Sequence, residues 1–245
     1  MVRSALVVCL LTFLSTACTS IGVHSARERE QLQFGPPQTL ALCLHVDDGI
    51  DEREARALVE EAWGEEGKLY ALTIRVAGVT RWKRQAFTID GLMEAITREP
   101  LEPPCDRVMA LVGRNVGDVL WALVGMPEVL GAVNEGTLTH GYTVARRASL
   151  NQVFSSPAAI LRHELYHMLG CEEHFNMPGC YAQIARLKRW RAEQAGDFFP
   201  AWDALQKRIL PTRAAVNARL SGAEDAPQAL PRDGVRPHAE NSQIE

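Results

Sequence analysis

The chain has 245 residues, of which 47% are hydrophobic and 23% charged, and its formal net charge at pH 7 is −4. This composition is typical of a globular protein, and the length suits one domain with tails. The slightly acidic balance gives no reason to expect nucleic acid as a partner. We expect a monomer.

The first residues are typical of an export signal. Arg3 is a short basic region, and residues 5–14 form an apolar run too short to span a bilayer as a helix. Small residues at 15–17 then offer a cleavage site, and Cys18 follows directly. A cysteine at this place resembles the lipobox of bacterial lipoproteins, in which it becomes the lipidated first residue. The usual apolar residue three places earlier is absent, so simple secretion after cleavage of residues 1–17 is the alternative.

The resemblance to lipoproteins implies a location as well as an anchor. Thr19 follows the cysteine, and without an Asp at that position the resemblance implies the outer membrane of the bacterial envelope. Residues 18–38 are polar and end in Gly-Pro-Pro, which is typical of a tether. We therefore expect membrane attachment through lipidated Cys18, with a folded domain beginning at residue 39.

Strand and helix patterns alternate in the first half of that domain. Three β-rich runs and two amphipathic helical segments follow one another at 39–46, 51–63, 69–79, 91–98 and 107–112. This order predicts a twisted, mostly parallel sheet with helices packed on it.

The remaining elements are shorter. Runs at 131–136 and 141–146 predict two strands at an antiparallel edge of the sheet, where free N–H and C=O groups are available to an extended peptide. Helical patterns follow at 181–193 and 201–209. The overall prediction is an α+β domain over 39–220 with an α/β-like N-terminal subdomain and a small helical C-terminal part. The composition of 221–245 predicts a disordered tail.

Residues 156–170 predict the helix that organises the site. Ser156 is a good N-cap, Pro157 suits the first helical position and Gly170 suits the end. The segment contains H-E-x-x-H, so His163 and His167 project from one face of the helix and can bind one metal ion. Two partly buried polar residues without a metal are the alternative.

The run from His163 to His174 resembles the signature of the metzincin metallopeptidases, H-E-x-x-H-x-x-G-x-x-H with a later Met-turn. The resemblance covers about residues 39–181. It implies Zn²⁺ bound by His163, His167 and His174, and Glu164 as the general base that takes a proton from water. In the family pattern the third ligand stands three residues after the glycine, where this chain has Glu173. We prefer His174, because imidazole suits zinc, and keep Glu173 as the alternative.

Other assignments depend on the same resemblance. Met177 is either the methionine of a Met-turn or a packing residue. Tyr142 and Tyr181 are candidates for stabilising an oxyanion, with a structural role as the alternative. His140 either lines the cleft or lies in a turn, and His45 is expected to be structural. In a rival gluzincin arrangement, Glu193 would be the third ligand and Asp197 would orient a histidine.

Six cysteines support an exported protein. Cys9 lies in the signal and Cys18 at the anchor, which leaves Cys43, Cys105, Cys171 and Cys180. In an oxidising periplasm we expect the bridges Cys43–Cys105 and Cys171–Cys180, with free buried thiols as the alternative.

The sequence as a whole predicts an exported, membrane-anchored zinc endopeptidase that acts on peptides or proteins. The alternative is an envelope lipoprotein that binds metal and cleaves nothing. The presence of Glu164 favours the enzyme, because a purely structural zinc site does not need this carboxylate.

Overall fold

A computed structural model describes residues 30–84, 88–113, 129–146, 156–174 and 176–223. The predicted signal peptide 1–17, the lipidation site Cys18 and most of the tail 221–245 lie outside these ranges. Within them, no helix combines the length and the apolar character needed to cross a membrane.

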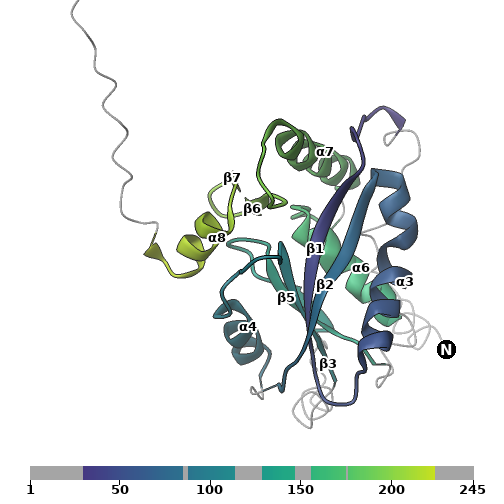
Figure 1. Cartoon of the computed structure of the whole chain (residues 1–245), viewed down its shortest axis with the longest axis vertical. Coiled ribbons are helices and arrows are strands. Elements are labelled where there is room, and N and C mark those ends of the chain that lie inside the picture. Colours follow the sequence, from purple (N-terminus) through teal and green to yellow (C-terminus); the bar gives the residue numbers. More distant parts are fainter. Residues whose placement is uncertain (1–29, 85–87, 114–128, 147–155, 175, 224–245) are drawn as a thin grey trace, which may run out of the picture.

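A five-stranded sheet forms the centre of the molecule (Figure 1). Its strand order is β2-β1-β3-β5-β4, and every neighbouring pair is parallel except β4 and β5, which are antiparallel. The predicted mixed sheet with one antiparallel edge strand is confirmed. The strands are β1 (Gln38–Val46), β2 (Leu72–Arg81), β3 (Arg107–Val112), β4 (Gly131–Val133) and β5 (His140–Val144).

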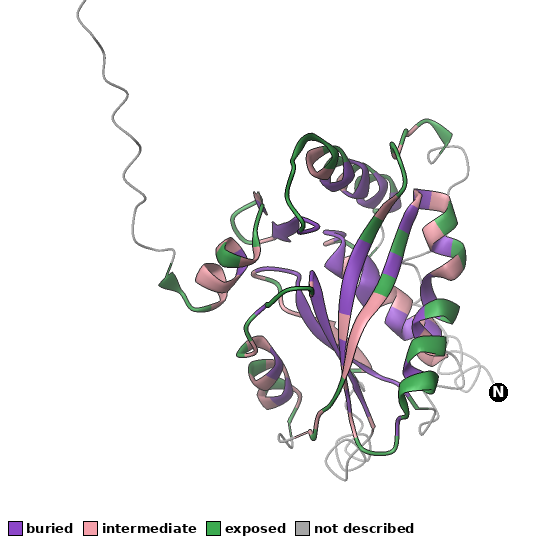
Figure 2. Ribbon diagram, viewed as in Figure 1, coloured by how far each residue is buried: buried purple, intermediate pink, exposed green. Residues whose placement is uncertain are grey.

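Helices cover both faces of the sheet. On one face, α3 (Glu52–Tyr70) and α6 (Pro157–Met168) share the main apolar core with β1. On the other face, α4 (Ile89–Thr97) packs on β3 and β5 in a smaller core. The sheet and the inner faces of these helices are accordingly the most buried part of the molecule (Figure 2).

Helix α3 is longer than the sequence predicts and ends at Tyr70 rather than near residue 63. Gly64 and Gly67 lie inside this helix and do not end it. At Gly67 the helix lies so close to the next strand that a Cβ would be 2.9 Å from the carbonyl oxygen of Leu72. Ala71 then ends the helix in the left-handed conformation, with φ 48°.

The C-terminal part corrects a prediction. Helix α7 (Met177–Glu193) and helix α8 (Arg213–Leu220) are present, but residues 201–209, predicted as helical, form a β-hairpin of β6 (Ala201–Asp203) and β7 (Arg208–Leu210). The Asp203 carboxylate accepts hydrogen bonds from the N–H groups of Leu205 and Gln206. This turn competes with the helix, because Asp favours such local bonds over helical ones.

Two disulfide bridges are formed as expected. Cys43, in β1, is bonded to Cys105, just before β3, and Cys171, in the segment that joins α6 and α7, is bonded to Cys180 in the first turn of α7.

Candidate metal centre

Helix α6 is built as its sequence predicts. The Ser156 side chain accepts a hydrogen bond from the N–H of Ala159 at 3.2 Å, and Pro157 is the first helical residue. Leu161 and Leu165 are fully buried in the main core. The chain then leaves the helix through Gly170, whose φ of 87° suits a residue without a side chain. The buried apolar face thus fixes the helix and directs the opposite face towards a cavity.

Three histidines converge at this face. The ring centroids of His163, His167 and His174 lie 4.8 to 5.0 Å apart, and one ligand nitrogen from each lies within 4.8 Å of the others. Among the residues that the structure describes, this is the only group of three or more His, Cys, Asp or Glu side chains with that geometry. The fold therefore brings together the three residues predicted as metal ligands.

The distances and the hydrogen bonds fit a zinc ion. Two nitrogens at ordinary bonding distance from a tetrahedral zinc would be about 3.3 Å apart, and the Nε2 atoms of His163 and His167 are 3.1 Å apart. The Nδ1 of His167 lies 2.6 Å from the carbonyl oxygen of Cys171. This carbonyl places the proton on Nδ1 and leaves Nε2 as the ligand atom.

The protonation of His167 also suits a ligand. The pKa of His167 is lowered, and burial is the largest cause. The hydrogen bond to the Cys171 carbonyl raises this pKa, whereas the nearby His174 lowers it. Neutral imidazole is the form that binds a metal.

Glu164 is held beside the histidines in a tightly packed position. Its exposed fraction is 4%, and burial raises the pKa of its carboxyl group to about 8. The contact comes from the first residue of the edge strand: a Cβ on Gly131 would lie 2.6 Å from Oε1 of Glu164. We did not predict this role for Gly131 from the sequence, although a glycine in a strand can indicate a close approach.

A cavity of about 490 Å³ opens beside these residues. One side is the edge strand β4, and another is the turn of the β6–β7 hairpin, which includes Leu205, a large apolar side chain that is 64% exposed. The lining residues also include Glu135, Leu138 and Glu172. The cavity thus lies between β4, the last strand of the sheet among the described residues, and the hairpin.

The alternative third ligands lie elsewhere. Glu173 is exposed and lines a separate, smaller cavity, and Glu193 is the exposed last residue of α7. Neither belongs to the histidine group. Asp197 forms an ion pair with Arg213 at 3.1 Å instead of contacting a ligand. The geometry favours His174.

The two tyrosines offered as oxyanion stabilisers are structural. Tyr142 is 1% exposed in the core beneath α4, on the opposite face of the sheet from α6. Tyr181 is fully buried, with its ring centroid 6.1 Å from that of Tyr70. Neither residue lines the cavity.

Three further candidates also prove to be structural. Met177 is the first residue of α7 and is buried in the main core, as expected of a packing residue, and it is not among the residues that line the histidine cavity. His140 is fully buried and bonds through Nδ1 to the Thr139 hydroxyl at 2.8 Å rather than lining the cleft. The ring of His45 lies 6.3 Å from that of Trp82, as expected of a packing residue.

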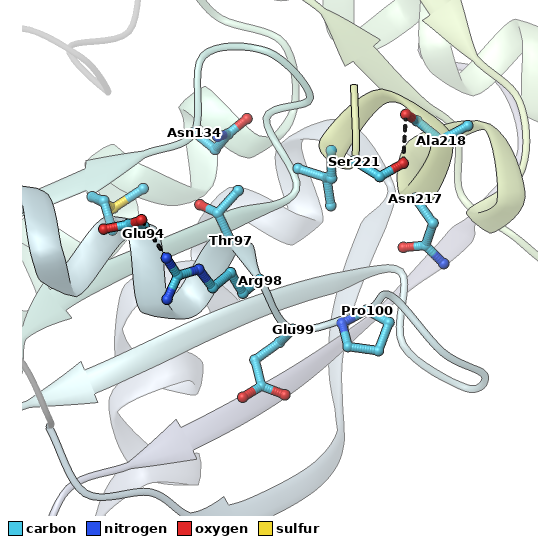
Figure 3. Close-up of a pocket in the computed structure, with 11 residues that line it drawn as sticks. Glu94, Thr97, Arg98, Glu99, Pro100, Asn134, Asn217, Ala218 and Ser221 are labelled. Atoms are coloured by element: carbon cyan, nitrogen blue, oxygen red, sulfur yellow. Dashed lines mark hydrogen bonds and ion pairs between the residues drawn. The ribbon is translucent and has the colours of Figure 1, made fainter. Parts of the chain in front are cut away.

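A larger cavity, of about 860 Å³, is drawn in Figure 3, and none of the three histidines is among the residues that line it. It is bordered by the end of α4 and by α8, and two of its three charged side chains, Glu94 and Arg98, form an ion pair with each other, the third being Glu99. Its polar side chain Asn217 is bonded to the backbone of Leu101. The residues that could bind a catalytic metal are therefore at the smaller cavity.

Comparison with known proteins finds no match, either to a protein family or to a curated protein. The interpretation of the site thus depends on its own geometry and on the motif.

Proposed function

We propose that the chain is a zinc-dependent endopeptidase of the metzincin type, anchored in the bacterial envelope. The observation that carries the proposal is the convergence of His163, His167 and His174 at a cavity that also holds the carboxylate of Glu164 and the edge strand β4. A zinc ion held by the three histidines would supply a Lewis acid and lower the pKa of water.

The chain's own groups would perform the proton transfers. The Glu164 carboxylate would take a proton from the attacking water and pass it to the amine of the leaving peptide. The Glu164 side chain extends from α6 and lies against Gly131, which limits its motion. This restraint favours the same geometry in both proton transfers.

The edge strand supports a peptide as substrate. In the part of the chain that the structure describes, β4 is the last strand of the sheet and pairs with β5 alone. All three of its residues, Gly131, Ala132 and Val133, line the cavity. An extended peptide would add to β4 by backbone hydrogen bonds, which do not depend on its sequence.

The two disulfides support the proposed location. Structural disulfides persist in oxidising compartments, and both bridges are formed in this domain. With the lipobox-like segment at Cys18, they favour an outer-membrane lipoprotein.

The test compares the wild-type full chain, purified in detergent, with the Glu164→Gln and His174→Ala variants. We expect the wild type to bind one zinc ion and to cleave unfolded protein substrates. Glu164→Gln should retain zinc and lose activity by at least about 100-fold, as for the loss of a general base, and His174→Ala should lose zinc.

The second candidate, a metal-binding lipoprotein without activity, predicts a different result. In that case the wild type and Glu164→Gln would bind zinc equally and neither would cleave any substrate. A wild type that binds no zinc would contradict both functions.

A further inference from the structure

Glu172 connects the segment after α6 to a distant part of the chain. It lies between Cys171 and His174, and its Oε1 accepts a hydrogen bond from Nε1 of Trp202 at 2.6 Å. Its Oε2 forms an ion pair with the ammonium group of Lys207. Both partners come from the β6–β7 hairpin, so one carboxylate links this hairpin to the loop that carries the third histidine.

The hairpin end of this connection is well fixed. Trp202 is only 4% exposed, and the guanidinium of Arg186, on α7, lies 4.6 Å from the centre of its ring. Trp202 is also paired with Ile209 in the two-stranded sheet. The indole N–H is therefore held in place by groups that do not belong to the metal site.

The other end of the connection lies next to two ligands. The carbonyl of Cys171, the residue before Glu172, accepts the hydrogen bond that orients His167. His174 is two residues further along the chain. A displacement of Glu172 would thus change the position of the carbonyl that orients one ligand and of the loop that carries another.

We propose that Glu172 is a positioning residue: bound to Trp202 and Lys207, it fixes the third-ligand loop and so increases the affinity of the three histidines for zinc. The inference rests on the proposed function only in taking zinc as the ion. The side chain of Lys207 is 64% exposed, so the ion pair is screened by solvent and its contribution is small. The Trp202 hydrogen bond is the main contact.

A simpler explanation would be that a negative charge near the site attracts the cation. The two explanations predict opposite changes in zinc affinity when the ammonium group of Lys207 is removed. If only charge matters, removal of the lysine ammonium should strengthen zinc binding. If Glu172 positions the loop, removal of its partner should weaken binding, although the lost charge is positive.

The experiment measures the zinc affinity of the full chain by competition with a chelating dye, in the wild type, Glu172→Ala, Glu172→Gln, Trp202→Phe and Lys207→Met. We expect Glu172→Ala and Trp202→Phe to weaken binding 10- to 100-fold, the range found when the groups that orient metal ligands are removed. Glu172→Gln should lose less, because its amide oxygen still accepts from Trp202. Lys207→Met should weaken binding a few-fold.

Glu173→Ala is the matched control. It removes the neighbouring carboxylate, which is exposed and outside the cavity, and should leave zinc affinity unchanged. Circular dichroism and thermal unfolding of the zinc-free variants check that each is folded. If Glu172→Ala does not fold, Trp202→Phe and Lys207→Met still test the proposal.

Two outcomes would overturn this inference alone: wild-type affinity in Glu172→Ala and Trp202→Phe, or tighter binding in Lys207→Met. A wild-type chain that binds no zinc would overturn the proposed function and this inference together, so the two failures can be told apart.

Discussion

The close approach of Gly131 to Glu164 depends on the absence of a side chain at position 131. The backbone of the edge strand lies against the carboxylate, and a Cβ on Gly131 would be within 2.8 Å of three atoms of Glu164. Such distances are shorter than any normal contact between carbon and these atoms. Only glycine therefore allows β4 to lie directly beside the proposed general base.

This contact leads to a prediction for Gly131→Ala. The added methyl group should displace Glu164 or β4 and lower kcat by about 10- to 100-fold, because small errors in the position of a catalytic group are costly. Zinc affinity should be unchanged, since the atoms nearest to the added methyl group belong to Glu164, which is not one of the three proposed ligands. Steady-state kinetics with a peptide substrate and zinc titration measure the two effects, and Ala132→Gly is the control. A variant with wild-type kcat would contradict the prediction.

The segment between α6 and α7 is the element on which the site depends most. It contains His174, and the Cys171–Cys180 bridge closes a loop with a sequence separation of 9 residues, whereas Cys43 and Cys105 are 62 residues apart. In the chain-entropy account the longer loop stabilises more, about 4 kcal/mol against about 3 kcal/mol. The shorter loop, however, is the one that carries His174, the proposed third ligand.

We therefore expect the two disulfides to differ in what they control. The double variant Cys171→Ser/Cys180→Ser should weaken zinc binding markedly and lower the free energy of unfolding by about 3 kcal/mol. Cys43→Ser/Cys105→Ser should cost about 4 kcal/mol and leave zinc affinity nearly unchanged, provided that unfolding is measured where the variant is still folded. Chelator competition and urea unfolding give the two quantities. Equal zinc affinity in both double variants would contradict the distinction.

At the scale of the whole molecule, Arg107 joins the sheet to the C-terminal part. It is fully buried at the start of β3, and its guanidinium donates to the carbonyl oxygens of Met168, Asp106, Phe199 and Pro200. Met168 is the last residue of α6, and Phe199 and Pro200 precede the β6–β7 hairpin. One side chain thus connects the helix that carries His163 and His167 with the hairpin that borders the cavity.

Replacement of this guanidinium should destabilise the whole fold. Arg107→Leu would leave several buried carbonyl oxygens without a donor, and we expect the free energy of unfolding to fall by about 3 kcal/mol or more. Arg98→Leu is the control, because Arg98 is paired with Glu94 at the surface and its side chain is 74% exposed. Its loss should cost no more than about 1 kcal/mol. Urea unfolding followed by circular dichroism compares them, and similar values for the two variants would contradict the prediction.

Local patterns in the sequence determined much of this protein. The caps of α6, the spacing of His163 and His167, and the strand–helix alternation up to residue 112 depend on neighbouring residues, and all are present in the structure. The two disulfide pairings were also predicted. The hairpin at 201–209 was not, because its residues fit a helical pattern and the turn depends on hydrogen bonds to Asp203.

The tertiary structure alone decided what surrounds the histidines. It favours His174 over Glu173 and Glu193, excludes Tyr142 and Tyr181 from the cavity, and places Gly131 and Trp202 beside the loop and helix of the site. These contacts join residues that are far apart in the chain, so no spacing in the sequence contains them. Local chemistry thus specified the histidine pair on the helix, and long-range packing specified the position of His174, the position of Glu164 and the walls of the cavity.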